Sequence, residues 1–426
     1  MRGSVDINSI KRVGSVNQHK EVLAISNFRR LLAARTISNF GNGMAPTALA
    51  FSILAMPNGD ATTLSLVLTA SAIPLVLMLP IGGVISDRRG RAFMISTMDI
   101  VLSLVVFAQA YLFTLAQPPI AALVVLAASA GVLNALWYPA YPGLPADLVD
   151  DSHLQTANSY ISFGSNAATI FGAAAGGWLV HTFGGSLALA VDAVTFLIAG
   201  LIVWTLRHTS SKSESKESVV TELRLGWQVF WSYKWVVVVV GVFSLIVMFL
   251  RATEGVLGPL VARDHFEGAV SWSQVTTTEG IGLLVGAVLA TRFRPSRPMV
   301  AGMLATLPAP LFMWALAGPA PLWVIATTSF MWGVGIEVMV ILWFTALQTH
   351  VPKQAIGRVS AYDAFGSLMF GPIGLALAGP LSQLYGTQPV LICAGALTLV
   401  MVCLSFLSKE VRDLLYVSPS AEAEPQ

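Results

Sequence analysis

Long apolar stretches, each suited in length to crossing a lipid bilayer, recur along almost the whole chain. A membrane-spanning helix needs about 20 predominantly apolar residues, and short polar or basic intervals separate these stretches, as expected where a chain leaves the membrane. Twelve spanning helices are predicted, over residues 31–56, 62–85, 93–115, 119–141, 155–180, 185–206, 235–260, 272–291, 299–317, 320–347, 358–384 and 388–408. The pattern therefore predicts an all-α membrane protein.

A longer polar interval divides these helices into two sets of six. It covers residues 207–234 and is predicted to be a cytoplasmic linker, and residues 1–30 and 409–426 are predicted to be cytoplasmic tails. The polar composition of the last tail predicts that it is disordered. Residues 31–206 and 235–408 are then the N-terminal and C-terminal six-helix bundles.

The two bundles also match each other in sequence. At a shift of 202 residues, the segment FGS at 163–165 in the fifth helix meets FGS at 365–367 in the eleventh, and Gly177 meets Gly379. Two halves that both start on the same side form a parallel repeat, about an axis normal to the membrane. Such an arrangement places a solute path between the halves.

Charge is scarce and asymmetric. Charged residues make up 11% of the chain and hydrophobic residues 55%, whereas a soluble domain carries about 25% charged residues. Most lysines and arginines fall on the side of the N-terminus, and the opposite loops carry only Arg263. The positive-inside rule makes the first side cytoplasmic, so both termini are predicted there. The net charge of +2 gives no indication of a nucleic-acid partner, and Cys393 and Cys403 have no disulfide or metal-ligand spacing.

The segment GVISDRRGR between the second and third helices combines three features that suit a gate. Its glycines, Gly83 and Gly90, allow a tight turn. Asp87 can lie against the positive N-terminus of another helix, and Arg88 and Arg91 can pair with acids. A simple basic anchor would explain the arginines but not Asp87 with its spaced glycines.

This segment resembles the signature loop of the major facilitator superfamily, G-x-x-x-D-R-x-G-R followed by a basic residue, which Ala92 replaces here. Residues 27–44 and 347–381 are similar to its drug-exporting branch, which includes macrolide-efflux-type proteins. The resemblance implies the major facilitator fold, with twelve helices in two pseudo-symmetric bundles, in a bacterial plasma membrane. It also implies a cytoplasmic gate in which Asp87 faces the eleventh helix and Arg91 pairs with an acid near the fourth. Three acids are candidates for that pairing: Asp147, Asp150 and Asp151.

Three glycines in the fifth helix, Gly172, Gly176 and Gly177, have two interpretations. Exporting antiporters of the superfamily show G-x-x-x-G-P-x-x-G-G here, but this chain has Ala168 and Ala173 where glycine and proline belong. Small residues spaced four apart also let helix backbones approach closely. Both interpretations, an antiporter element and a packing surface, stay open.

Ionisable residues within the predicted helices mark the candidate transport site, because such a group at mid-bilayer costs about 2.5–3.5 kcal/mol on insertion scales. Glu337 is the deepest acid, and because the resemblance implies that the tenth helix lines the cavity, it implies that Glu337 binds and releases the coupling proton. Arg251 and Glu254 can pair on one helix face, and Glu279 lies about 10 Å from the outer end of its helix. Further candidates for the cavity wall are Arg35, Asn39, Asn42, Asn134, Trp137, Tyr138, Tyr141, Trp332 and Trp343. The aromatic members also suit anchors at the membrane interface. Two acids are predicted to be structural: Asp99 and Asp192.

These features predict secondary active export of an amphiphilic small molecule such as an antibiotic, by proton antiport and alternating access. The partners expected are the substrate, protons and the lipid bilayer; the chain is expected to work as a monomer with no cofactor or metal. An alternative is a dedicated exporter or importer of one metabolite, for example a siderophore. An intramembrane enzyme is disfavoured because H-E-x-x-H, G-x-S-x-G and G-x-x-x-x-G-K-[ST] are absent. A sensor would need a sizeable soluble domain.

Overall fold

The computed structural model describes residues 19–206 and 227–416, and these contain helices but no strand. The predicted tails and linker therefore lie in part outside the described residues. The first half contains α2 (Ser26–Leu54), α3 (Ala61–Arg89), α4 (Arg91–Leu112), α5 (Ile120–Trp137), η1 (Pro145–Asp147), α6 (Asp151–Phe183) and α7 (Gly185–Trp204). The second half contains α9 (Lys234–Ala252), η2 (Thr253–Leu257), α10 (Gly258–His265), α11 (Ala269–Ala290), α12 (Pro298–Ala305), α13 (Pro308–Ala317), α14 (Leu322–His350), α15 (Lys353–Leu368), α16 (Gly371–Tyr385), α17 (Thr387–Ser405) and α18 (Lys409–Arg412).

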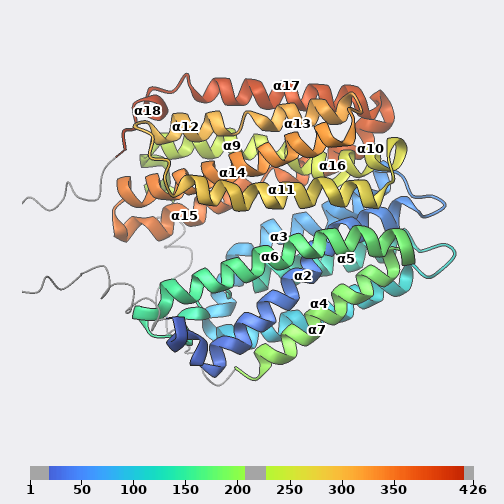
Figure 1. Ribbon diagram of the computed structural model, residues 1–426, viewed down its shortest axis with the longest axis horizontal. Helices are drawn as coiled ribbons and strands as arrows, with labels where there is room; N and C mark the ends of the chain where they lie inside the picture. Colours follow the sequence, from blue (N-terminus) through green and yellow to red (C-terminus); the bar gives the residue numbers. More distant parts are fainter. Residues whose placement is uncertain (1–18, 207–226, 417–426) are drawn as a thin grey trace, which may run out of the picture.

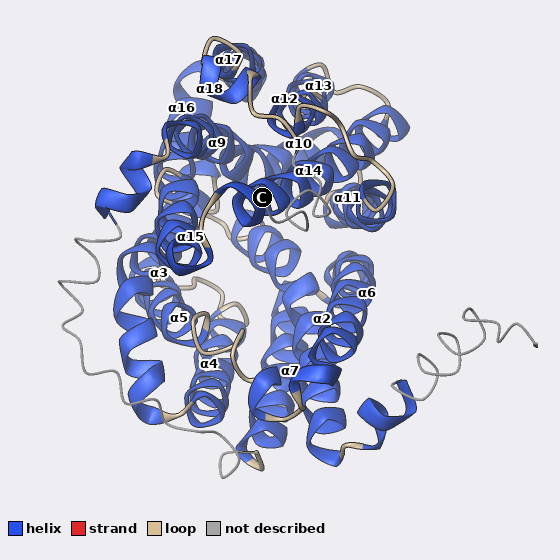
Figure 2. Cartoon of the chain, turned by 90° about the vertical axis from the view of Figure 1, so that its left-hand side faces the viewer, coloured by secondary structure: helices blue, strands red, loops and turns tan. Residues whose placement is uncertain are grey.

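The helices form two groups that follow the order of the chain. Helices α2 to α7 pack together in one group and α9 to α18 in the other (Figure 1). Seen along the helices, the two groups lie next to each other (Figure 2). Both ends of the described chain lie at the same end of the helices (Figure 1). We call this the terminal face and the opposite one the distal face.

Nine stretches of the described residues are long and apolar enough to cross a membrane. Helices α2, α6 and α11 are also long, at 29, 33 and 22 residues, but they are more polar. They pack against one another, α2 on α6 and α6 on α11. Some of their polar residues, among them Ser38 and Thr47 of α2 and Ser273 of α11, are buried, which removes the cost of placing these side chains against lipid.

Three predicted spans are interrupted, which corrects the prediction of single helices. The span 235–260 continues to His265 through a π-helical turn, η2, and the spans 299–317 and 358–384 each break into two helices. A proline lies in the first turn of each second helix, at Pro259, Pro308 and Pro372. Proline lacks an N–H and clashes with the carbonyl four residues earlier, which favours a widened turn or a restart of the helix at these positions, although α2 continues through Pro46.

The C-terminal tail is ordered further than its composition predicts. Helix α18 is capped by the Ser408 side chain, and Val411 is fully buried. The Tyr416 N–H donates a hydrogen bond to the Ser296 carbonyl at 2.9 Å. The prediction of disorder is therefore wrong for residues 409–416, because one buried valine and this hydrogen bond dock the segment on the second half.

Two glycine turns repeat across the halves. Gly184 joins α6 to α7 with φ 85° and ψ 161°, and Gly386 joins α16 to α17 with φ 88° and ψ 153°. Positive φ values of this size favour glycine, which has no Cβ. The two turns are 202 positions apart, the shift at which the two halves match in sequence.

Candidate functional site

The two halves touch most closely at the distal face, through one glycine on each side. A Cβ at Gly177 of α6 would lie 2.0 Å from the Ser273 Oγ of α11, and a Cβ at Gly379 of α16 would lie 2.3 Å from the Ala61 carbonyl of α3. The Gly379 N–H donates to the Ser65 Oγ at 2.7 Å. We call these contacts the distal seam. Because the two glycines are equivalent in the repeat, the seam is pseudo-symmetric.

Asp60 adds a polar contact to the distal seam, just before α3 begins. Its carboxylate accepts a hydrogen bond from the Thr63 N–H at 2.7 Å and another from the Gln383 side chain in the opposite half. Partial burial acts to raise the pKa of Asp60, but the hydrogen bonds from Thr63 and Gln383 together outweigh it and leave the pKa below the usual value.

We expect the Asp60–Gln383 contact to be independent of pH between about pH 5 and about pH 8. A carboxyl group with a lowered pKa favours the bonded state at higher pH and loses that contribution only as pH falls through the lowered value. Spin labels at Asn58→Cys and Leu384→Cys, both exposed, measure the distance across the seam. Asp60→Asn is the control that weakens the contact, and a distance that changes near neutral pH in the native background contradicts the prediction.

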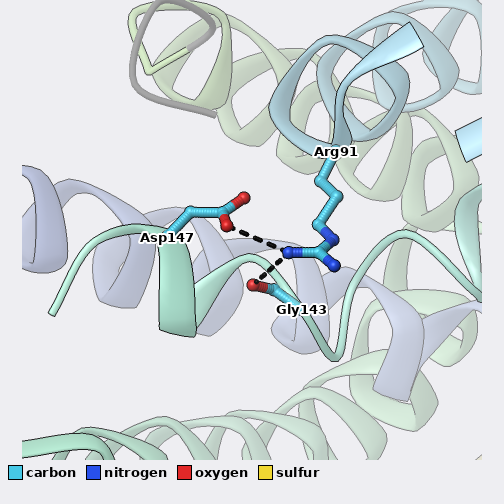
Figure 3. A network of polar contacts seen from close by, with 3 residues as sticks. All are labelled: Arg91, Gly143 and Asp147. Atoms are coloured by element: carbon cyan, nitrogen blue, oxygen red, sulfur yellow. Dashed lines mark hydrogen bonds and ion pairs between the residues drawn. The ribbon is translucent and has the colours of Figure 1, made fainter. Parts of the chain in front are cut away.

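The candidate gate lies on the terminal face, where Arg91 begins α4. Its Nη1 lies 2.9 Å from the Asp147 Oδ1 and donates to the Gly143 carbonyl at 3.2 Å (Figure 3). A Cβ at Gly143 would lie 2.3 Å from the Arg91 Nε, so the absence of a side chain makes room for the guanidinium. Gly90 directly precedes Arg91 with φ 91°. Of the three candidate acids, the structure thus pairs Arg91 with Asp147.

The rest of the predicted gate loop lies outside what the structure describes. The side chains of Asp87 and Arg88, and the surroundings of Gly83, are not among the described features. The contact of Asp87 with the eleventh helix therefore stays a prediction.

In the first half, Arg35 is the centre of a buried polar and aromatic cluster. Its guanidinium carbon lies 4.5 Å from the centre of the Trp137 ring and 4.3 Å from that of Tyr141, and these rings stack 5.2 Å apart. Asp99 of α4 interacts electrostatically with Arg35. The sequence did not connect these two residues, and the structure brings their charges near enough to attract each other.

Two asparagines share a face of α2 with Arg35. Asn39 donates to the Arg35 carbonyl at 2.8 Å and to the Ser165 Oγ at 3.1 Å. Asn42 is exposed and lies two helical turns beyond Arg35, so it points in nearly the same direction. Asn134 of α5 instead bonds the Ala130 carbonyl of its own helix at 2.9 Å.

In the second half, two acids from different helices meet. Glu254 lies in the π-helical turn η2 and Glu279 lies on α11. The two carboxylates interact electrostatically with each other and with Arg251, and the Trp332 indole N–H faces both. Turns of π-helix occur frequently at functional sites. The sequence predicted the pairing of Arg251 with Glu254 but did not bring Glu279 to it.

Glu337 has a different environment. It lies where α14 packs on α11, with its Cβ 2.9 Å from the position of a Cβ at Gly286. Its side chain is partly exposed and, within the described part of the chain, takes part in no hydrogen bond or ion pair. Its predicted role in proton transfer is neither supported nor opposed by these contacts.

The fifth-helix glycines lie at close helix contacts. A Cβ at Gly172 would lie 2.0 Å from the Phe40 carbonyl, and one at Gly176 would lie 2.8 Å from the Met44 Cα, both on α2. Gly177 faces α11 instead, in the distal seam. The structure also adds Asp60, Ser65 and Gly143, which sequence reasoning missed. Only Gly143 carried a signal, since it follows two prolines at the end of the fourth helix.

Within the described residues, nine apolar spans, three more polar long helices and two halves joined at the distal seam define a multi-pass membrane protein. The model of the Major Facilitator Superfamily matches residues 31–375. The chain therefore belongs to the major facilitator superfamily.

Curated relatives of this chain include drug and siderophore exporters. The chain is 28% identical over 404 residues to the multidrug efflux pump Tap of Mycolicibacterium fortuitum, covering 90% of this chain and 96% of that protein. It is 24% identical over 388 residues to the enterobactin exporter EntS of Escherichia coli, covering 88% and 91%. It is also 24% identical over 403 residues to the uncharacterized MFS-type transporter YfiS of Bacillus subtilis, covering 90% and 93%. These similarities agree with the drug-exporting branch predicted from the sequence.

Solved structures of transporters share the fold. A mutant of the nucleoside transporter NupG superposes with a TM-score of 0.74 at 14% identity, covering 90% of this chain and 99% of that one. A chain from a study of proton-dependent oligopeptide transporters gives a TM-score of 0.63 at 14% identity, covering 91% and 98%. These superpositions show the shared fold; membership of the superfamily and the similarity to exporters make the chain a secondary transporter.

Proposed function

We propose that this transporter exports an amphiphilic small molecule in exchange for protons, by alternating access between its two halves. The observation that supports this most is the meeting of Glu254, Glu279 and Arg251 among helices of the second half. Ionisable residues within a membrane bundle mark ion and substrate pathways. Full-length similarity to a multidrug efflux pump supports export and a substrate of the drug type.

The proposed architecture has twelve spanning helices in two six-helix bundles, over residues 31–206 and 235–408. Adding the polar helices α2, α6 and α11 to the nine apolar spans gives this number. The equivalent turns at Gly184 and Gly386 support two related halves.

The terminal face is proposed to lie in the cytoplasm of a bacterial cell. Arg29 and Lys234 lie near the starts of α2 and α9, and Arg91 begins α4, all at this face. Basic residues concentrate on the cytoplasmic side of membrane proteins. The structure, with its seam at the distal face, is then the state closed to the outside.

The proposed coupling site is the pair formed by Glu254 and Glu279. Two carboxylates near one arginine have one negative charge in excess, and a charge without a partner is costly within a membrane bundle. A proton bound to one carboxylate removes the excess negative charge. Release of that proton to the cytoplasm lets the pair bind another proton. Glu337, the deeper acid of the sequence, is the competing site within the same proposal.

Transport in a host that lacks its own efflux pumps tests the function. Cells expressing the chain should accumulate less of several unrelated amphiphilic compounds than cells with the empty vector, and a protonophore should abolish the difference. Retention of the difference with the protonophore present contradicts proton coupling. Equal accumulation of every compound in both strains contradicts export of amphiphiles.

The similarity to the enterobactin exporter favours a second candidate, export of one dedicated metabolite. The same compound panel separates the two. A multidrug exporter protects the host against several unlike compounds, whereas a dedicated exporter protects against none and instead increases release of one metabolite into the medium.

A further inference from the structure

The turn between α5 and α6 is held by two arginines from different helices. Arg91 of α4 binds its Gly143 carbonyl and its Asp147 carboxylate. Arg35 of α2 lies over the rings of Trp137 and Tyr141, at the start of the same turn. Only the first of these contacts belongs to the predicted gate loop.

The surroundings of Arg35 suit a residue that holds the neighbouring rings in place. The residue is 8% exposed, and its Nε is buried without a hydrogen-bond partner. The guanidinium therefore depends on the two aromatic faces and on Asp99. A desolvated arginine is attracted to the faces of aromatic rings, and the planar guanidinium stacks on them where a lysine ammonium cannot.

Helix α4 connects the two arginine contacts. It carries Arg91 at its first position and Asp99 eight residues later, which is about 12 Å along the helix axis. One rigid helix thus touches the turn directly through Arg91 and indirectly through Asp99, Arg35 and Tyr141. A shift of the turn away from Arg35 also carries the Asp147 carboxylate away from Arg91.

We infer that Arg35 is a positioning residue for the gate: it fixes the α5–α6 turn so that Gly143 and Asp147 meet Arg91. The inference rests on the proposed role of Arg91 and Asp147 as a gate. It gives the buried arginine of α2 a role in the conformational cycle apart from substrate or proton binding.

The test follows exposure of the turn with a cysteine at Ala146, which is exposed next to Asp147. Cys393 and Cys403 are first replaced by serine, and the rate of modification by a membrane-impermeant maleimide is measured in inside-out vesicles. Arg35→Lys keeps the charge beside Asp99 but loses the stack, and Tyr141→Leu removes one ring. We expect each of these changes, and Asp147→Asn as well, to alter the labelling rate at Ala146→Cys by at least about fivefold.

Two controls separate positioning from damage to the fold. Arg29→Lys makes the same chemical change at an exposed site on α2 and should leave the rate as in the parent protein. A cysteine at Gln117, which is exposed between α4 and α5 and is not part of the distal seam, labelled from outside in right-side-out vesicles, should react at the parent rate in Arg35→Lys. A general loss of structure would change both sites.

The outcomes separate this inference from the gate on which it rests. If Asp147→Asn changes labelling while both Arg35→Lys and Tyr141→Leu behave like the parent, Arg35 does not position the turn. If Gln117→Cys labelling changes along with Ala146→Cys, the role of Arg35 is structural and the inference is wrong. Unimpaired transport by Asp147→Asn would contradict the proposed gate role of Arg91 and Asp147. The labelling of the Arg35 variants would still decide whether Arg35 holds the turn.

Discussion

Replacing Glu279 by glutamine is expected to lower proton-driven transport by more than about tenfold. Glutamine has nearly the same shape and can still face the Trp332 indole N–H, but it cannot take up or release a proton. The Glu254 carboxylate then has Arg251 as its only charged neighbour in the cluster. Exchange of substrate across the membrane without a proton gradient should persist, because that exchange needs no net proton movement.

The measurement compares proton-driven uptake into inside-out vesicles with substrate exchange at equal pH on both sides. Glu267→Gln is a matched control, since Glu267 is exposed outside the spans. Glu337→Gln tests the competing acid: if Glu337→Gln loses proton-driven transport and Glu279→Gln keeps it, the proton site lies where α11 meets α14. Undiminished proton coupling in both variants would exclude both acids from the proton-transfer mechanism.

Replacing Gly379 by alanine is expected to open the distal seam and to reduce transport by more than about tenfold. The added Cβ would lie 2.3 Å from the Ala61 carbonyl and 2.5 Å from the Ser65 Oγ. The nearest atom belongs to the backbone of α3 and cannot rotate away, so the two halves must separate. Overpacking of this kind costs about 1–3 kcal/mol, which is enough to shift an equilibrium between two states by about fivefold to more than a hundredfold.

Gly241→Ala is the matched control for this change. Gly241 is also helical, but a Cβ there would meet nothing within 4 Å. Spin labels at Asn58→Cys and Leu384→Cys should report a longer distance across the seam in Gly379→Ala and an unchanged one in Gly241→Ala. A native distance together with native transport in Gly379→Ala would show that the seam does not need the close approach.

The sequence predicted the fold because a bilayer imposes its thickness on the chain. Each span must be apolar over about 30 Å, so the run of residues 185–206 ends within two positions of α7 (Gly185–Trp204). The breaks were harder to predict. Pro259, Pro308 and Pro372 were visible, but the choice between a π-helical turn and a restarted helix depends on how the neighbouring helices pack.

The candidate site, too, was predictable from the sequence only in part. The charged residues stood out in an apolar sequence, and Arg251 with Glu254 follows from spacing along one helix. The meeting of Glu279 with Glu254 depends on how the surrounding helices place η2 beside α11, and the interaction between Arg35 and Asp99 on how they place α2 and α4. Helix crossings are set by the side chains of both partners together, which no single stretch of sequence specifies.

By itself, then, the sequence determined that the chain lies in a membrane as apolar helices, that its halves repeat and that a few charges interrupt the apolar spans. Each of these can be read from short or repeating stretches of sequence, because a polar group in lipid costs free energy wherever it occurs. Only the tertiary structure decided which charges meet, where two glycines close the distal seam and which acid binds Arg91. Those contacts join residues far apart in the chain, and their geometry comes from the packing of whole helices.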